Sequence, residues 1–169
     1  PNVVLQNYTY NEFSGDGDSV VNPGESIRLY ITIENLIPWN NASNIDVLLY
    51  SNNNQILVEN NSFDIDFLFP GSSSSNNSSP FLVSTTPEIP LGNYNLNLMI
   101  DANGANNTTY NDSFEIPLNI TLEQYGFPFE SIDEVTVESS PLILTDSSKG
   151  QIGIFFGDHL GSFYGIDFN

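Results

Sequence analysis

The chain has 169 residues, of which 39% are hydrophobic, and this is enough apolar material for a packed core. The absence of cysteine excludes disulfide scaffolds and thiolate metal sites, and a formal charge of −19 argues against nucleic acid as a partner. No apolar run is long enough for a membrane-spanning helix, so no membrane insertion is expected. Salt and divalent cations ease such self-repulsion, which favours an extracellular or cell-surface location.

The N-terminal residues, PNVVLQNYTY, predict a strand rather than a leader. A secreted chain of this kind would have lost its signal or would be an internal piece of a longer protein. Alternation of apolar and polar residues then dominates the chain, as in half-buried β-strands. The clearest example is Ile27, Leu29, Ile31 and Ile33. The same period predicts strands at residues 45–49, 63–67, 94–100 and 114–120, with shorter ones at 3–8, 55–58 and 81–84.

Clusters of Asn, Ser, Gly and Pro separate these strands, as in SNNNQ, PGSSSSNNSSP and DANGANN. Seven or eight short strands at this spacing predict an all-β fold, an immunoglobulin-like antiparallel sandwich over residues 1–121. Pro117 lies inside the last of these strands and cannot donate to a ladder, so it predicts an edge strand or a bulge.

The pattern changes after residue 121. Residues 122–135 are acidic and aromatic without alternation and predict a linker in which Tyr125, Phe127 and Phe129 pack between two β units. Residues 136–169 predict a small C-terminal β unit of three strands. Three strands need a surface to cover their apolar face, so this unit either packs on the sandwich or begins a longer domain.

The stretch SGDGDSVVNPGESIRLYITIENLIPWNNASNIDVLLYS resembles adhesion-type (CARDB-like) sandwich modules of large secreted bacterial and archaeal proteins. The tail VESSPLILTDSSKGQIGIFFGDHLGSFYGIDF is similar to one propeller-like (FG-GAP-like) blade, although DSSKG replaces the Asp-rich calcium loop of that pattern. The resemblance implies a stalk, spacer or binding accessory beside a catalytic or adhesive partner.

The acidic turn, residues 16–25, is the first candidate site. Calcium prefers six to eight oxygen ligands, and Asp16, Asp18, Asn22 and Glu25 could supply several of them. The turn is not an EF-hand, because the twelfth position counted from Asp16 is Ile27 and no flanking helices are predicted. The alternative is a plain turn in which the Asp side chains bind backbone N–H groups and Glu25 is solvated.

Nine Asn-x-Ser/Thr triplets occur, a modest excess over chance in so Asn-rich a chain. Those in predicted loops are the expected glycosylation sites; the alternative is that these residues only supply turn chemistry. They are Asn41, Asn76, Asn77, Asn106 and Asn107.

Trp39 lies in a polar corner loop, where it could stack on a sugar or plug the end of the sandwich. His159 is expected to be a turn residue, and no motif such as Gly-x-Ser-x-Gly accompanies it. Asp64 and Asp66 are expected on the solvated side of their strand, so no catalytic pair is predicted.

The sequence therefore favours a non-catalytic structural or adhesive spacer module, with calcium as a candidate cofactor. Its partners would be other domains of a larger protein or neighbouring subunits, and glycans in one version. A filament subunit assembled by β-strand complementation is the second hypothesis, because the C-terminal strands lack a partner sheet. A carbohydrate-binding module that uses Trp39 is the third.

Overall fold

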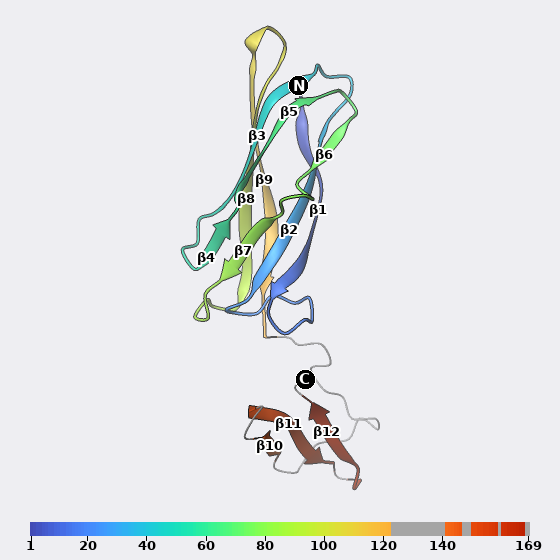
Figure 1. Cartoon of the computed structure of the whole chain (residues 1–169), viewed down its shortest axis with the longest axis vertical. Helices are drawn as coiled ribbons and strands as arrows, with labels where there is room; N and C mark the ends of the chain where they lie inside the picture. The colour runs from blue at the N-terminus through green and yellow to red at the C-terminus, as the bar shows by residue number, and fades with distance from the viewer. Residues whose placement is uncertain (123–140, 147–149, 159, 168–169) are drawn as a thin grey trace. The chain divides into compact units, whose positions relative to one another are not determined.

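A computed structural model describes residues 1–122, 141–146, 150–158 and 160–167 (Figure 1). The chain divides into two compact units, Pro1–Tyr125 and Gly126–Asn169, and each is described by itself. An immunoglobulin-like antiparallel sandwich and a small three-stranded C-terminal sheet make up the fold, so the predicted all-β class is confirmed. Residues 123–140, which include Tyr125, Phe127 and Phe129, lie outside the described residues.

Two antiparallel sheets form the first unit. One has the strand order β1-β2-β7-β4, with β6 also pairing with β2, and the other has the order β5-β3-β8-β9. A 3₁₀ turn, η1 (Ala105–Asn107), joins β8 to β9. The strands are β1 (Val3–Ser14), β2 (Ser26–Asn35), β3 (Ala42–Ser51), β4 (Ile56–Glu59), β5 (Ser62–Leu68), β6 (Ser73–Ser75), β7 (Phe81–Thr85), β8 (Gly92–Asn103) and β9 (Thr109–Ile120).

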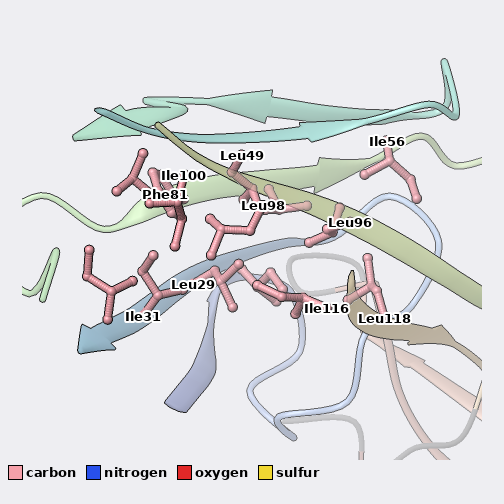
Figure 2. Close-up of a cluster of buried hydrophobic side chains, with 14 of the residues drawn as sticks. Leu29, Ile31, Leu49, Ile56, Phe81, Leu96, Leu98, Ile100, Ile116 and Leu118 are labelled. Atoms are coloured by element: carbon pink, nitrogen blue, oxygen red, sulfur yellow. The ribbon is translucent and has the colours of Figure 1, made fainter. Parts of the chain in front are cut away.

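The core lies between the two sheets. The four apolar residues that predicted the strand at 27–33 are all buried in β2, and so are Leu96, Leu98 and Ile100 of β8 in the opposite sheet. Figure 2 shows side chains from the two sheets meeting in one cluster. The period of two therefore predicted the inward faces of the central strands correctly.

A β-bulge interrupts this alternation in β3. Asn44 has a positive φ of 46°, the pairing of β3 with β8 shifts between Ser43 and Asp46, and Ala42 and Ile45 are both buried. On the partner strand β5, Leu68 is buried while Phe67 is 43% exposed. The sequence pattern placed Phe67 on the same face as Phe63 and Ile65. That prediction was wrong, because a bulge re-aims side chains on the strands around it.

The Ser- and Asn-rich stretch after residue 70 was predicted as a loop but contains the short strand β6. Strand β7 pairs with only the first part of β2, from Ser26 to Leu29, and β6 pairs with the later part, from Thr32 to Glu34. Asn76 follows β6 and is buried, with its side-chain oxygen accepting from Ile31 N–H at 2.8 Å and its amide donating to the Leu29 carbonyl at 3.2 Å. These contacts satisfy backbone groups of β2 that would otherwise lack a partner.

The long edge strands of the sandwich carry features that oppose further pairing. Pro117 lies in β9, which among the described strands pairs only with β8, so the predicted edge position is confirmed. On the other sheet, β1 is an edge strand whose register shifts twice, between Leu5 and Asn7 and between Glu12 and Ser14. Proline and bulges both discourage the addition of a strand from another chain.

The second unit is an antiparallel sheet of three strands, β10 (Leu142–Asp146), β11 (Gly150–Gly157) and β12 (Phe163–Asp167), in that order. Phe155 stacks on Phe163, and its ring covers Gly165, where a Cβ atom would come within 2.7 Å of the ring. Asp158 organises the hairpin loop by accepting from Leu160 N–H, Ser162 N–H and the Tyr164 hydroxyl. The Tyr164 hydrogen bond, with the two N–H groups, holds the pKa of Asp158 below its usual value.

Candidate functional site

The acidic turn joins β1 to β2 at one end of the sandwich. The structure brings Asp16 and Asp18 together with Glu12 of β1, and one carboxylate oxygen from each lies within 4.8 Å of the others. Glu12 accepts hydrogen bonds from Gly17 N–H at 2.8 and 2.9 Å, one to each oxygen. Gly17 has a φ of 89°, which glycine adopts without strain, and this lets the turn close over the carboxylate.

Both aspartates of the turn also bind backbone. Asp16 Oδ1 accepts from Asp18 N–H at 3.2 Å, and Asp18 Oδ1 accepts from Val20 N–H at 2.7 Å. These are Asx-type hydrogen bonds, in which one side-chain oxygen accepts from the backbone N–H two residues later. The aspartate hydrogen bonds of the plain-turn alternative are therefore present.

Glu25 stabilises the turn from its far side. Its carboxylate accepts from Asn22 N–H at 2.8 Å and from Asp16 N–H at 3.3 Å. Burial raises the pKa of Glu25 above its usual value, the charges of Asp16 and Glu12 add to this, and the two N–H groups oppose it. Glu25 is thus partly buried and bound to backbone, which differs from the solvated residue of the plain-turn alternative.

Gly15 lies where the carboxylates of Glu12 and Glu25 converge. A Cβ atom at this position would collide with the carboxylates of both residues. Only glycine lets the two side chains approach the backbone here.

The turn is anchored to the rest of the sandwich by Thr85. Its hydroxyl accepts from Gly24 N–H at 2.9 Å and lies 3.0 Å from the Asn22 carbonyl, to which it can donate. Val21 is buried, and its carbonyl accepts from Thr121 N–H at 3.1 Å. The turn therefore contacts both sheets.

The predicted calcium ligands are thus only partly the group that the structure assembles. Asp16 and Asp18 belong to it, while Glu25 and the backbone of Asn22 bind each other. Glu12 was not predicted as a ligand, because it lies in β1, before the turn. The available signal was a carboxylate at the end of the preceding strand. Three convergent carboxylates are the hard oxygen donors that calcium prefers, and a bound cation would offset their mutual repulsion.

Trp39 lies at the opposite end of the sandwich, in the loop between β2 and β3. It is 53% exposed, so the prediction that it plugs the sandwich is wrong. It lines a pocket of about 360 Å³ together with Asn41, Ser43, Phe67 and residues from the turn between β8 and β9. Val3 and Ala42, which begin β1 and β3 at this end, are fully buried.

Asn35 connects three segments at this end of the sandwich. It is fully buried, its amide donates to the carbonyls of Asn40 at 2.9 Å and Leu68 at 3.1 Å, and its oxygen accepts from Asn2 N–H at 3.1 Å. The loop of Trp39, the end of β5 and the start of β1 are therefore tied to one side chain.

Tyr110 makes a second tie at the same end. Its hydroxyl lies 2.9 Å from the Val3 carbonyl and 3.1 Å from Asp112 Oδ2. Burial raises the pKa of Tyr110 to about 12, and the neighbouring Asp112 adds to this effect. The hydroxyl joins β9 to β1 across the open side of the sandwich.

The predicted glycosylation sites differ in exposure. Asn41, Asn77 and Asn106 are exposed, whereas the side chain of Asn107 lies outside the described part. Asn76 is 2% exposed, and both polar atoms of its side chain bind β2. The prediction for Asn76 is therefore wrong for the folded chain, because a glycan on its amide would break these contacts.

No arrangement typical of an active site was predicted, and the residues weighed for catalysis are placed as follows. Asp64 and Asp66 are exposed, as expected, and Asp64 lies opposite Asp46 on the outer face of its sheet. His159 lies outside the described residues.

Comparisons with known proteins give no family. No family model matches the chain, and no curated protein does. Among solved structures, the crystal structure of Spo0M, a sporulation control protein from Bacillus subtilis, is similar at 12% identity with a TM-score of 0.30. The match covers 89% of this chain and 67% of that one.

Proposed function

We propose that this chain is a non-catalytic spacer module of an extracellular or cell-surface protein. The observation that carries the proposal is the position of the two strands by which the chain enters and leaves the sandwich. Strand β1 starts beside Leu36, whose N–H donates to Asn2, at the end where Trp39 lies. Strand β9 ends beside Val21, at the end of the sandwich where the acidic turn lies (Figure 1).

The start of β1 and the end of β9 thereby lie at opposite ends of the sandwich. A strand of 12 residues, such as β1 or β9, spans roughly 40 Å at about 3.3 Å per residue. A module with this path extends a protein, because each copy adds its own length to the chain. The strongly acidic composition fits an outer surface that must stay soluble.

Calcium is proposed to rigidify the acidic turn through Glu12, Asp16 and Asp18. Asp18→Asn keeps a side-chain oxygen that can accept from Val20 N–H, while it removes the charge. We expect calcium to raise the melting temperature of the native chain but to have much less effect on Asp18→Asn. Saturation at one hundred times the dissociation constant would stabilise the fold by about 2.7 kcal/mol.

The matched control is Asp64→Asn, which removes an exposed carboxylate far along the chain from the turn and should leave the calcium response intact. An identical melting curve for the native chain in calcium and in chelator would remove the calcium clause. It would leave the spacer proposal standing, since the path of the chain does not depend on the ion.

The spacer role itself is tested by replacement. In the parent protein, exchanging the sandwich for an unrelated sandwich of similar length should preserve the function of the neighbouring domains, whereas deleting it should not. Failure of every replacement would point to a specific partner instead. Antibodies should label the chain on intact cells; labelling only after permeabilisation would contradict the proposed location.

Assembly with neighbouring subunits is the second candidate, and the C-terminal sheet favours it. Leu142, Ile143 and Phe163 are 64%, 50% and 74% exposed on a sheet that has three strands in the described part of this unit. Exposed apolar surface of this kind marks an interaction site. Light scattering that rises with concentration would support filament formation by strand complementation, and a monomer at all concentrations would exclude it.

A further inference from the structure

We propose that the pocket beside Trp39 binds a neutral sugar ring of a glycan carried by another molecule. The inference goes beyond the spacer role and does not depend on it, because a sandwich can extend a chain whether or not its end holds a ligand.

The lining of the pocket carries no charge. The chain has a net charge of −19, yet none of the described residues that line this pocket is acidic or basic. A surface that excludes carboxylates at one place in so acidic a protein suits an uncharged ligand, because burying part of a charged ligand without a partner is costly.

The side chains at the pocket combine aromatic faces with amides and a hydroxyl. Trp39 and Phe67 offer rings whose negative faces attract the C–H groups of a pyranose. Asn40, Asn41 and Ser43 offer donors and acceptors that match the hydroxyl groups around such a ring. Both aromatic side chains are about half exposed, 53% for Trp39 and 43% for Phe67, so they are accessible to a ligand.

The fold holds these groups in place before any ligand arrives. Phe67 pairs with Ser43, next to the bulge at Asn44, and the buried Asn35 ties the Trp39 loop to the end of β5. Phe69 packs edge-on against Phe67, with ring centroids 4.7 Å apart and planes at 72°. A site fixed by packing and buried hydrogen bonds loses little entropy on binding.

The size of the pocket suits one ring rather than an extended chain. Its volume of about 360 Å³ lies at the lower end of the range for small-molecule sites, roughly 300–1,000 Å³. A proline-rich peptide is the other uncharged ligand that prefers aromatic surfaces, but it needs a longer groove. A sugar at the end of a glycan satisfies both the size and the mixed lining.

The test uses Trp39 as its own reporter, because it is the sole tryptophan of the chain. Protein made in a host without N-glycosylation is screened on an array of neutral glycans, and the hits are titrated while tryptophan emission is recorded. We expect a saturable change in emission and a loss of affinity of at least about tenfold in Ser43→Ala, because Ser43 lines the pocket and its hydroxyl, which donates to the Asn103 carbonyl at 3.4 Å, can also accept from a sugar. On the array, Trp39→Ala should lose binding by a similar factor or more.

The matched control is Tyr50→Ala, which removes an exposed aromatic residue of β3 outside the pocket and should bind as the native chain does. Circular dichroism would confirm that all variants keep their strands. Absence of any neutral glycan hit would overturn the proposal, as would equal binding by Trp39→Ala or a response to proline-rich peptides alone. A glycan found on Asn41 of the native protein and filling the pocket would overturn its assignment to another molecule.

Discussion

The two ends of the sandwich differ in charge: carboxylates cluster at one end, and neutral side chains line the other. At the acidic turn, Glu12, Asp16 and Asp18 converge, and backbone N–H groups bind their carboxylates. At the Trp39 end the lining is neutral, and the buried Asn35 binds backbone carbonyls and one N–H. The first end therefore depends on charge and salt, whereas the second depends on packing and on one neutral side chain.

The largest effect on the free energy of unfolding is expected from Asn35→Ala at the Trp39 end. It leaves the Leu68 carbonyl without this donor in a buried place and the Asn40 carbonyl without it in a partly buried one. We therefore expect a loss of about 2–4 kcal/mol in the free energy of unfolding. The loss should be the same in low and high salt. Denaturant unfolding at two ionic strengths measures it, and a loss that shrinks strongly with salt would contradict the neutral account of this end.

A smaller effect is expected at the other end from Gly15→Ala. The new methyl group would displace the carboxylates of Glu12 and Glu25, which are flexible enough to move, so we expect a cost of about 1 kcal/mol. Ser14→Ala, one residue earlier, is the control and should cost less. Thermal unfolding of both variants decides the comparison, and the absence of a difference between them would show that the carboxylates are not held against the backbone.

The smallest effect is a dependence on alkaline pH at the Trp39 end. The pKa of Tyr110 is raised from 10.0 to about 12 on folding, so the stability it contributes is complete below pH 10.0 and is lost as the pH rises towards 12. Because Tyr110 is only partly buried, solvent screens the interactions of its hydroxyl and we expect no more than about 1 kcal/mol. The stability of the native chain should fall relative to Tyr110→Phe over this interval. Parallel curves for the two proteins would show that the phenol ionises as it does in the unfolded chain.

The sequence predicted the strands better than it predicted the ends of the sandwich. Ile27, Leu29, Ile31 and Ile33 alternate without interruption, so the inward face of β2 followed from period alone. Phe67 could not be placed this way, because its direction depends on a bulge in the neighbouring strand. A bulge depends on how two strands pair, and the residues around Asn44 form no pattern that predicts one.

The candidate sites show the same limit. Asp16 and Asp18 were found because they lie together in the sequence, but Glu12 joins them only when β1 and the turn fold back on each other. Asn76 was predicted as a loop residue among serines. In the structure, β6 and β7 each pair with only part of β2, and the Asn76 side chain accepts from Ile31 N–H between them. Contacts between distant segments decided both outcomes, and one sequence carries little information about them.

The opposite placement of the start of β1 and the end of β9 determines how the sandwich would respond to a mechanical load. A pull applied through Asn2 and Ile120 would act along the strands, while the hydrogen bonds between β1 and β2 run across them. The bonds of the β1–β2 ladder would then bear the force together, in shear, rather than opening one at a time from an end. A chain that holds its neighbours apart would in this way also resist being drawn out under tension.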